Sequence, residues 1–152
     1  MNLKLEIAPD LPEEIVIRAP EATEEVLHMQ AEISKLLTGG TEIAVCKGNT
    51  ECFLSYREIL FAETAENRTW VHTAKDSFAC PLRLYELEEI LPRNFMRASK
   101  SGIVNTALIC SLLRTPTGIG EAAFRNTEKR IFISRMYFKP IRERIEETRL
   151  KR

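Results

Sequence analysis

The sequence predicts a mainly β fold, α+β overall, in which one or two helices accompany a twisted assembly of short strands. From residue 41 onward, short apolar or alternating segments are separated by turn residues at high density. The hydrophobic content of 44% is sufficient for a core, which argues against a disordered chain. The length of 152 residues allows one domain, or one domain with an appendage.

Residues 1–40 form the appendage, for which we predict a β-β-α extension. Apolar residues alternate at 3–7 and recur at 15–17, which indicates two short strands around a turn. A helix is expected to begin near Pro20 and to end at the glycine pair before residue 41. It carries one apolar stripe, formed by Val26, Met29, Ile33 and Leu36. We expect this stripe to pack either on the rest of the protein or on a second copy.

Residues 41–152 are predicted to form the main domain. In its first half, strands are expected at 42–46, 51–54, 59–63, 69–73 and 78–80. A helix is expected from residue 81 or 82 to Leu91, because Pro92 ends it. The second half adds a basic stretch at 91–105, strands at 107–113, 120–125 and 130–134, and a last helix at 140–148.

The basic stretch 91–105 contains three cations and no acid. Phe95, Ile103 and Val104 indicate that part of it packs in the core. Lys100 lies between two serines just before a glycine, and such donors at a turn can converge on phosphate oxygens. An ordinary strand with a solvated basic edge explains the same residues equally well.

The formal net charge is zero, but the charges are divided unevenly along the chain. Residues 1–90 contain 8 basic and 17 acidic residues, a net charge of −9. Residues 91–152 contain 14 basic and 5 acidic residues, a net charge of +9. This asymmetry indicates an anionic partner for the second half. Part of the basic charge is also expected to pair with the acidic half inside the fold.

The sequence offers little support for an enzyme or a metal protein. The four cysteines lack the close spacing of a zinc site, and neither histidine lies near a cysteine. Glycine-rich phosphate loops and local nucleophile–histidine pairs are lacking as well. We therefore expect no catalytic residue, no metal site, no cofactor, and free, mostly buried thiols. Without a signal-peptide core or a long apolar segment, we expect a soluble cytoplasmic protein.

Three polar segments combine cations with amide, hydroxyl or aromatic groups: residues 66–68, 99–101 and 134–139. Asparagine suits adenine, arginine or lysine suits guanine, and serine or tyrosine suits the DNA backbone. If a β scaffold holds such loops in line, they can enter a DNA groove as a helix does. Taken singly, each segment is more often a solvated turn.

From about residue 42 to 147 the chain resembles the LytTR-type DNA-binding domain of bacterial transcriptional regulators. Residues 59–63, 68–73 and 84–92 are similar to consecutive elements of that family. The most specific match is to the family signature, through Phe95, Arg97, Lys100, Ser101, Val104 and Asn105. Residues 133–137 match the closing Ser-Arg-x-Tyr of the family.

The resemblance implies an elongated, mainly β domain of about ten short strands with a helix. Its loops contact successive grooves on one face of double-stranded DNA, which bends. Carried over position by position, the expected DNA-binding residues are Asn67, Arg68, Ser99, Lys100, Ser101, Arg135, Tyr137 and Lys139. Arg97 is expected to be structural and neutralised by a neighbour. Ala98 and Gly102 replace larger residues often found in the family, which indicates a looser central strand.

About 40 residues precede the domain, too few for the receiver domain that many such regulators carry. The chain is more similar to compact stand-alone regulators, which often share an operon with a membrane protein, so such a protein is one expected partner. A second copy is another, bound through the apolar stripe so that two half-sites are read together. The alternative function is a non-enzymatic protein-interaction module, an anti-regulator whose basic half binds an acidic partner.

Overall fold

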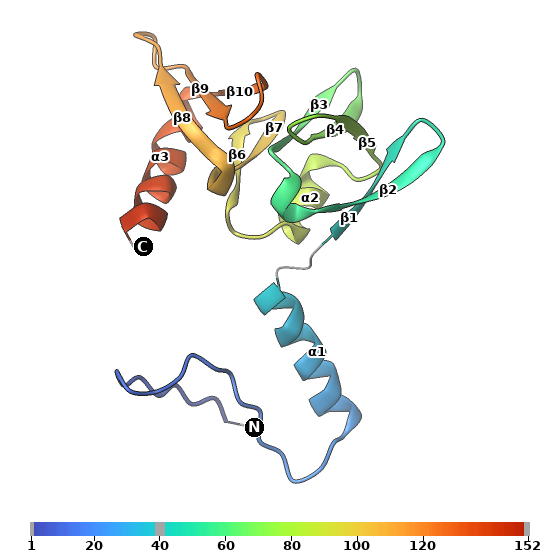
Figure 1. The fold of residues 1–152 in the computed structure, drawn as a ribbon, viewed down its shortest axis with the longest axis vertical. Coiled ribbons are helices and arrows are strands. Elements are labelled where there is room, and N and C mark those ends of the chain that lie inside the picture. The colour runs from blue at the N-terminus through green and yellow to red at the C-terminus, as the bar shows by residue number, and fades with distance from the viewer. Residues whose placement is uncertain (1, 39–41, 151–152) are drawn as a thin grey trace. The chain divides into compact units, whose positions relative to one another are not determined.

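The computed structural model describes residues 2–38 and 42–150 and divides the chain into two compact units, Met1–Leu37 and Thr38–Arg152. Figure 1 shows the helix α1 and the segment before it in the first unit. The second unit contains all the described strands and two further α-helices.

The first unit contains α1 (Glu24–Thr38). Thr23 caps this helix, because its hydroxyl accepts a hydrogen bond from the Val26 amide at 3.3 Å. Two glutamates in the first turn interact favourably with the helix dipole. The predicted stripe is half-buried at Val26, Met29 and Ile33, and the side chain of Leu36 lies outside the described residues.

The two strands predicted at residues 3–7 and 15–17 are wrong, because residues 2–23, all of them described, contain no strand. Leu3 and Ile7 are 102% and 86% exposed, so their alternation rests on no core. An isolated two-stranded hairpin is marginal in water without a third strand or a packed helix. Two prolines between the predicted strands also remove backbone donors.

Seven strands of the second unit form one antiparallel sheet in the order β2-β1-β5-β4-β3-β7-β6. They are β1 (Glu42–Lys47), β2 (Thr50–Ser55), β3 (Phe61–Ala65), β4 (Arg68–His72), β5 (Ser77–Cys80), β6 (Phe95–Ser99) and β7 (Gly102–Asn105). The 3-10 helix η1 (Tyr56–Glu58) follows β2, and α2 (Leu84–Ile90) follows β5. The strands predicted in this region are confirmed, with ends shifted by a few residues.

The other described strands form a three-stranded antiparallel sheet in the order β10-β9-β8. They are β8 (Ile109–Arg114), β9 (Gly120–Phe124) and β10 (Arg130–Ile133), preceded by the 3-10 helix η2 (Thr106–Leu108) and followed by α3 (Arg135–Leu150). The predicted mainly β architecture is thus confirmed. No helix among the described residues is long and apolar enough to cross a membrane.

The last helix begins earlier than predicted: α3 starts at Arg135, and Pro140 lies inside it. The sequence prediction placed this proline in the first turn, where a missing amide hydrogen does no harm. In the structure the Ser134 carbonyl accepts hydrogen bonds from two amides of the first turn, each at 3.1 Å. A proline in a helix interior costs about 3 kcal/mol. Burial of Phe138 and Ile141 against the core offsets this cost.

Two hydrophobic clusters form the core of the second unit. In the first, Leu84 and Leu87 of α2 pack with Ile103 and other residues of the seven-stranded sheet. The second cluster joins the three-stranded sheet and α3 to the edge of the large sheet, where Phe138 packs near Ala98. The two sheets and two helices are therefore held as one body, which fixes the turns that project from it.

The hairpin of β6 and β7 is closely packed rather than loose. Ala98 is fully buried, and a side-chain carbon added at Gly102 would lie 3.2 Å from Ile131 Cδ1. The expectation of a looser central strand is therefore wrong, because Ile131 from the small sheet fills the space. Ile103 and Val104 are buried in the core, as predicted.

Candidate nucleic-acid interface

The first predicted contact segment is a two-residue turn between β3 and β4. Glu66 and Asn67 both have left-handed backbone conformations, with φ of 53° and 63°. Such a turn matches the twist of its flanking strands, and asparagine tolerates it better than most residues. Ala65 and Arg68 pair across the turn, so Asn67 and Arg68 are exposed at its tip.

The second segment is the turn between β6 and β7, which two serines shape. The Ser99 hydroxyl accepts a hydrogen bond from the Ser101 amide at 3.2 Å and lies 3.4 Å from the Ser101 hydroxyl. The pairing register shifts between Arg97 and Ser99, so the strand bulges just before the turn. Lys100 is exposed at the tip.

Arg97 holds the second turn in place. Its Nε donates to Glu88 Oε2 at 2.9 Å, and its Nη1 donates to the Lys100 carbonyl at 2.9 Å. The side chain is only 19% exposed. The expectation that Arg97 is structural and neutralised by a neighbour is thus confirmed. The same ion pair joins the acidic half of the chain to the basic half, as expected for part of the charge.

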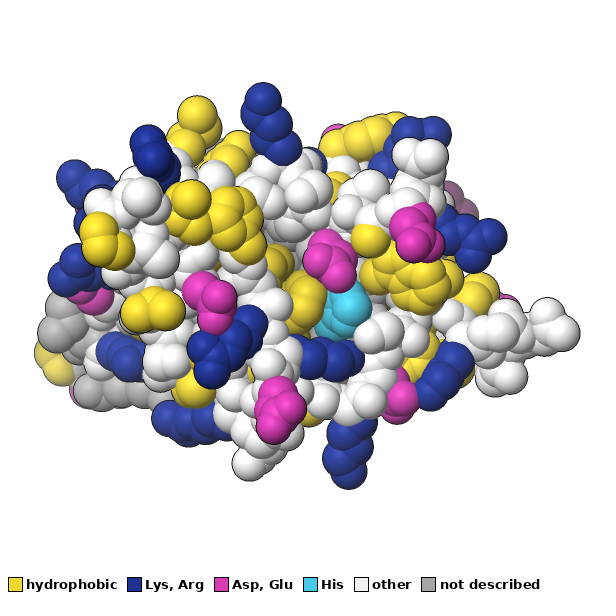
Figure 2. All heavy atoms as spheres, turned by 90° about the horizontal axis from the view of Figure 1, so that it is seen from above, with side chains coloured by type: hydrophobic (Ala, Val, Ile, Leu, Met, Phe, Trp, Pro, Cys, Tyr) yellow, Lys and Arg dark blue, Asp and Glu magenta, His cyan; other side chains and the backbone are white. Residues whose placement is uncertain are grey.

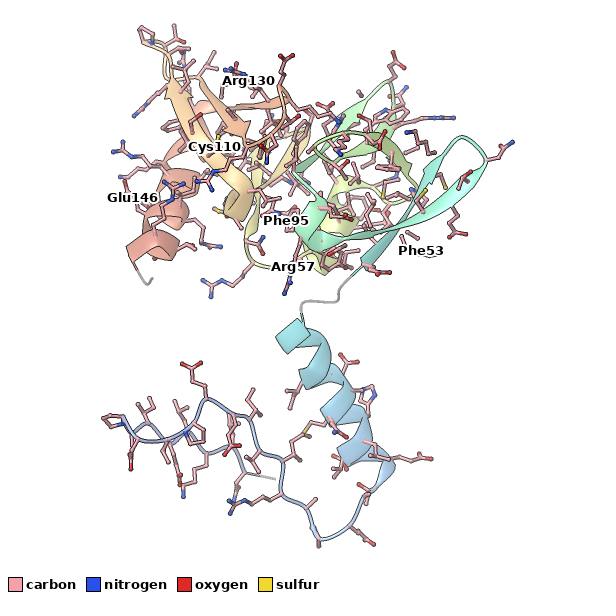
Figure 3. The ribbon with its side chains drawn as sticks, viewed as in Figure 1. Phe53, Arg57, Phe95, Cys110, Arg130 and Glu146 are labelled. Atoms are coloured by element: carbon pink, nitrogen blue, oxygen red, sulfur yellow. The ribbon has the colours of Figure 1, made fainter. Side chains whose placement is uncertain are left out.

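Asn105 fixes the base of this hairpin. Its buried side chain donates to the Ile59 carbonyl at 2.9 Å and accepts from Asn94 Nδ2 at 2.6 Å. The same oxygen accepts from the amide two residues further on, at 3.1 Å. Phe95, labelled in Figure 3, is partly buried beside this network and packs edge-on to the Tyr56 ring at 6.4 Å. The turn therefore projects from a well-supported base.

Arg135 of the third segment lies in the first turn of α3 rather than in a loop. It is exposed, and its aliphatic carbons lie along the turn between β8 and β9. A side-chain carbon at Gly118 would lie 3.3 Å from Arg135 Cγ, and Gly118 has a φ of 92°. Glycine thus suits both the backbone and the arginine. The sequence prediction missed this support, because no local signal links two segments so far apart.

Backbone hydrogen bonds bring the three segments side by side. The Thr64 amide donates to the Ser101 carbonyl at 2.9 Å, which joins β3 to the second turn. The Ser134 amide donates to the Ala98 carbonyl at 2.8 Å, which joins the start of α3 to β6. Figure 1 shows β3, β7, β6 and β10 in neighbouring positions. We call the exposed side chains on these segments the contact row: Asn67, Arg68, Lys100 and Arg135.

Among the described residues of the second unit, some cations pair with acidic side chains, and others, including those of the contact row, do not. Among the described residues, Arg68, Lys100 and Arg135 form no ion pair. Elsewhere Lys47 pairs with Asp76 at 2.6 Å. On the face seen in Figure 2, lysine and arginine side chains project at several places. Apolar patches and individual acidic side chains lie between them.

A basic groove of about 820 Å³ lies beside the Lys100 turn. Its charged lining consists of Arg93, Arg97, Lys100, Arg144 and one acid, Glu88. Tyr137 is half-buried and lines the same groove, so the structure brings Tyr137 and Lys100 together. Lys139 is exposed on α3 and does not line the groove. The sequence prediction missed Arg144, although it lies about two helical turns after Tyr137 and therefore on the same face.

His72 lies in a polar cluster at the far end of β4 from the first turn. Its Nε2 is 3.0 Å from Glu63 Oε1, its Nδ1 is 2.8 Å from Ser77 Oγ, and the Phe61 ring stacks on it at 4.4 Å. The pKa of His72 is lowered, because burial and the positive charge of Lys129 together outweigh the charge and hydrogen bond of the Glu63 carboxylate. The cluster joins β3, β4 and β5. His72 thus lies in a strand, as the sequence predicted.

The four cysteines are free, but only Cys80 is buried and the other three are half-buried. The expectation of mostly buried thiols is therefore met in full at Cys80 only, whereas Cys52 packs against the core of the large sheet without being fully covered. Burial raises the pKa of the Cys80 thiol. Within residues 2–38 and 42–150, no three His, Cys, Asp or Glu side chains gather in a way that could hold a metal ion.

Fold and site together define the class of protein. Exposed arginine, lysine and asparagine side chains on adjacent turns of a β scaffold are the groups that contact phosphates and base edges. Because the scaffold fixes the turns by packing and hydrogen bonds, these groups are held ready for a partner. The arrangement suits a nucleic-acid-binding domain.

Comparison with known proteins identifies the family. The LytTr DNA-binding domain family matches residues 50–146. An HTH-type transcriptional regulator of Staphylococcus aureus strain MSSA476, itself uncharacterised, is 32% identical over 146 residues, which cover 95% of this chain and 98% of the relative. A similar regulator of strain NCTC 8325 / PS 47 is 42% identical over 73 residues, covering 48% of this chain and 49% of the relative.

A solved structure agrees with this fold. It is the LytTr DNA-binding domain of a Bacillus cereus protein described as a methyl-accepting/DNA response regulator. The two structures share a TM-score of 0.62 at 19% sequence identity, over 68% of this chain and 94% of the other. The likeness confirms the predicted fold class.

The chain belongs to the LytTR family of DNA-binding domains, and this membership makes it a DNA-binding protein of transcription regulation. The family resemblance inferred from the sequence is confirmed. The name of the relatives refers to a helix-turn-helix. In the described part of this chain, however, strands separate α1, α2 and α3 from one another.

Proposed function

We propose that this protein binds specific sequences of double-stranded DNA through the contact row and thereby regulates transcription. The observation that carries the proposal is that Arg68 and Lys100 at two hairpin turns and Arg135 at the start of α3 are exposed and form no ion pair among the described residues. Cations held in this way favour an anionic partner with regularly spaced charges. We propose that the two hairpin turns and the start of α3 enter successive grooves on one face of the DNA, which bends to meet them.

The proposed DNA-contacting side chains divide into two roles. Arg68, Lys100 and Arg135 suit the acceptor atoms of guanine, and Asn67 suits adenine. The other candidates suit phosphate oxygens, which position the protein without reading sequence: Ser99, Ser101, Tyr137 and Lys139. The neighbouring groove adds further cations for the same backbone. Specificity should therefore depend on the contact row and affinity on both groups.

The position of Arg135 supports an anionic partner. It stands in the first turn of α3, which contains no acid. A cation at the positive end of a helix dipole is unfavourable by roughly 0.3–1 kcal/mol. DNA placed there would offer guanine acceptors to the guanidinium and a neighbouring phosphate to the N-terminus of the helix. Binding therefore removes an unfavourable interaction that the free protein retains.

The experiment is a gel shift with the DNA upstream of the protein's own gene, at two salt concentrations and with excess nonspecific competitor. Lys100→Ala and Arg135→Ala should each weaken specific binding by about 1–3 kcal/mol. Arg142→Ala is the matched control, because Arg142 is exposed on α3 and paired with Glu146 at 3.2 Å. Affinity should fall steeply with salt. If both test variants bind like the control variant, these turns do not read DNA.

We also propose that the protein forms a homodimer through the stripe of α1 and acts in the cytoplasm without enzymatic activity. The support is that Val26, Met29 and Ile33 lie on one side of a capped helix. Two linked domains would bind two half-sites with greatly increased apparent affinity. Family membership does not favour the alternative of a protein-interaction module.

A further inference from the structure

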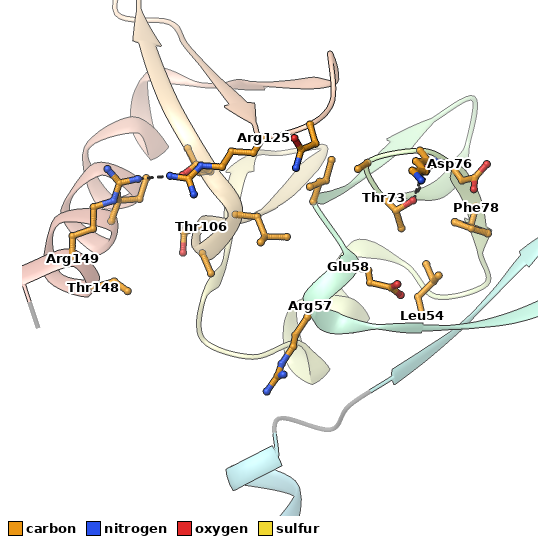
Figure 4. Close-up of a pocket in the computed structure, with 18 residues that line it drawn as sticks. Leu54, Arg57, Glu58, Thr73, Asp76, Phe78, Thr106, Arg125, Thr148 and Arg149 are labelled. Atoms are coloured by element: carbon orange, nitrogen blue, oxygen red, sulfur yellow. Dashed lines mark hydrogen bonds between the residues drawn. The ribbon is translucent and has the colours of Figure 1, made fainter. Parts of the chain in front are cut away.

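A second cleft, of about 800 Å³, lies within the second unit between its two sheets. Figure 4 shows the side chains that line it. They come from β2, η1 and the residues just after it, the segment between β4 and β5, β5, η2, the start of β8, the turn after β9, and the end of α3. None of the contact-row residues lines this cleft, so it is separate from the proposed DNA site.

The cleft has an apolar wall supplied by both parts of the core. Leu54 and Phe78 belong to the core of the large sheet, whereas Leu60 and Ile109 belong to the core of the small sheet. Ile145 of α3 adds a further apolar surface. The volume falls within the range of roughly 300–1,000 Å³ typical of small-molecule sites, which are mainly apolar with a few fixed polar groups.

The charged groups of the cleft are distributed unevenly. In Figure 4, Arg125 and Arg149 lie at one end, and Glu58 and Asp76 at the other. Arg149 is held there, because its Nη2 donates to the Ile109 carbonyl at 3.3 Å. Asp76 is already engaged by Lys47, which lowers the pKa of its carboxyl group. The lining also includes Arg57 and Lys75, so basic groups outnumber acidic ones in the cleft, and Arg125 and Arg149 supply the positive charge at their end.

We propose that this cleft binds a small organic anion that carries an apolar body, such as a carboxylate or sulfonate on an aromatic or hydrocarbon frame. The anionic head lies between Arg125 and Arg149, which attract it and offer parallel donors. The apolar body lies against Leu60, Phe78 and Ile145 and gains affinity from its burial.

Such a ligand would contact both sheets at the place where they are joined. The Thr127 hydroxyl donates to the Ala74 carbonyl at 3.0 Å, and Lys129 Nζ donates to the Asp76 carbonyl. These bonds link the turn after β9 to the segment between β4 and β5, at the edge of the cleft. Arg68 and Lys100 of the contact row belong to the large sheet, whereas Arg135 belongs to α3. A ligand that contacts both parts could therefore change their relative position, which makes the cleft a suitable place for an effector.

The test uses two fluorescent probes with the same ring skeleton and no DNA. Anilinonaphthalene sulfonate carries the anionic group, and phenylnaphthylamine lacks it. We expect the full chain to bind the sulfonate at one saturable site with blue-shifted emission. The neutral probe should bind at least about tenfold more weakly, because it lacks charge-assisted hydrogen bonds to the arginines.

Three variants locate the site. The double substitution Arg125→Gln and Arg149→Gln should lower sulfonate affinity about tenfold and leave the neutral probe unchanged. Leu108→Trp should reduce binding of both probes, since residue 108 lines the cleft and a larger ring occupies its volume. Arg142→Gln on the exposed side of α3 is the control and should behave like the unmodified protein.

Amide chemical shifts of the full chain decide the outcome even if the tryptophan variant fails to fold. Addition of the sulfonate should shift amides on both sides of the cleft, including those of Ala74, Thr106 and Asn126. Shifts confined to the outer face of the small sheet, around Leu113 and Phe132, would overturn the proposal, because these exposed apolar residues would then be the binding surface. Equal affinity for the two probes would also overturn it. Since no DNA is present, neither result depends on the proposed function.

Discussion

Gly120 allows α3 to approach the three-stranded sheet. A side-chain carbon added at this position would overlap the ring of Phe138, which is 4% exposed in the core. The start of α3, and with it Arg135, is thus positioned by the absence of one methyl group on β9. No local pattern in the sequence indicates this requirement, since Gly120 and Phe138 are neighbours only after folding.

At this residue, Gly120→Ala should lower the free energy of unfolding by about 1–3 kcal/mol, because the new methyl group must displace a packed ring. Gly48→Asn is the control: Gly48 has a φ of 62° with nothing within 4 Å of an added carbon, and asparagine tolerates this conformation. Urea unfolding measures the stability of both variants, and unchanged m-values show that the same surface is exposed on unfolding. Equal stability of the two variants would show that the ring moves aside without cost.

Among the elements, β3, β4 and β5 are joined by the His72 cluster. The imidazole lies between Glu63 on β3 and Ser77 on β5, at 3.0 and 2.8 Å. Lys129 donates to the same serine at 3.2 Å and brings a positive charge toward the ring. Because burial and Lys129 disfavour the charged form, a neutral His72 suits this site.

This cluster predicts a pH dependence of stability. The pKa of folded His72 lies below the ordinary value of 6.5, so the unfolded chain takes up protons first as the pH falls. The contribution of His72 to stability should therefore be constant above about pH 7.5 and should decrease as the pH falls through 6.5 toward the folded pKa. In chemical unfolding at several pH values, His72→Gln should flatten this slope, whereas His28→Gln, at an exposed position on α1, should not. A slope of opposite sign would mean that Glu63 outweighs burial.

For the whole molecule, local features were predictable and long-range ones were not. Turn residues, alternating strands and apolar helix faces act between near neighbours, and they predicted the strands from residue 42 onward and the core positions Ile103 and Val104. The strands predicted near Leu3 failed, because alternation without a core to cover does not stabilise a sheet. The hydrogen bond from Ser134 to Ala98 and the cleft between the sheets depend on segments brought together by folding.

Assembly is the remaining property at this scale. If the stripe of α1 forms a dimer, Met29→Glu should place a charge in the apolar interface and shift the protein to a monomer. Gln30→Glu introduces the same charge one residue away, at an exposed position, and should leave the dimer intact. Burying an unpaired charge costs several kcal/mol, which exceeds what a helix pair of this length can readily absorb.

Sedimentation equilibrium measures the mass of both variants, and gel shifts on DNA with one or two half-sites measure the consequence. The Met29→Glu variant should bind DNA with two half-sites about 10²–10⁴-fold more weakly than the Gln30→Glu variant, because it loses the effective concentration of a linked second domain. The two variants should bind a single half-site equally, since α1 is distant in sequence from the contact row. A monomeric mass for the unmodified protein and for both variants would refute the dimer while leaving DNA binding by one domain intact.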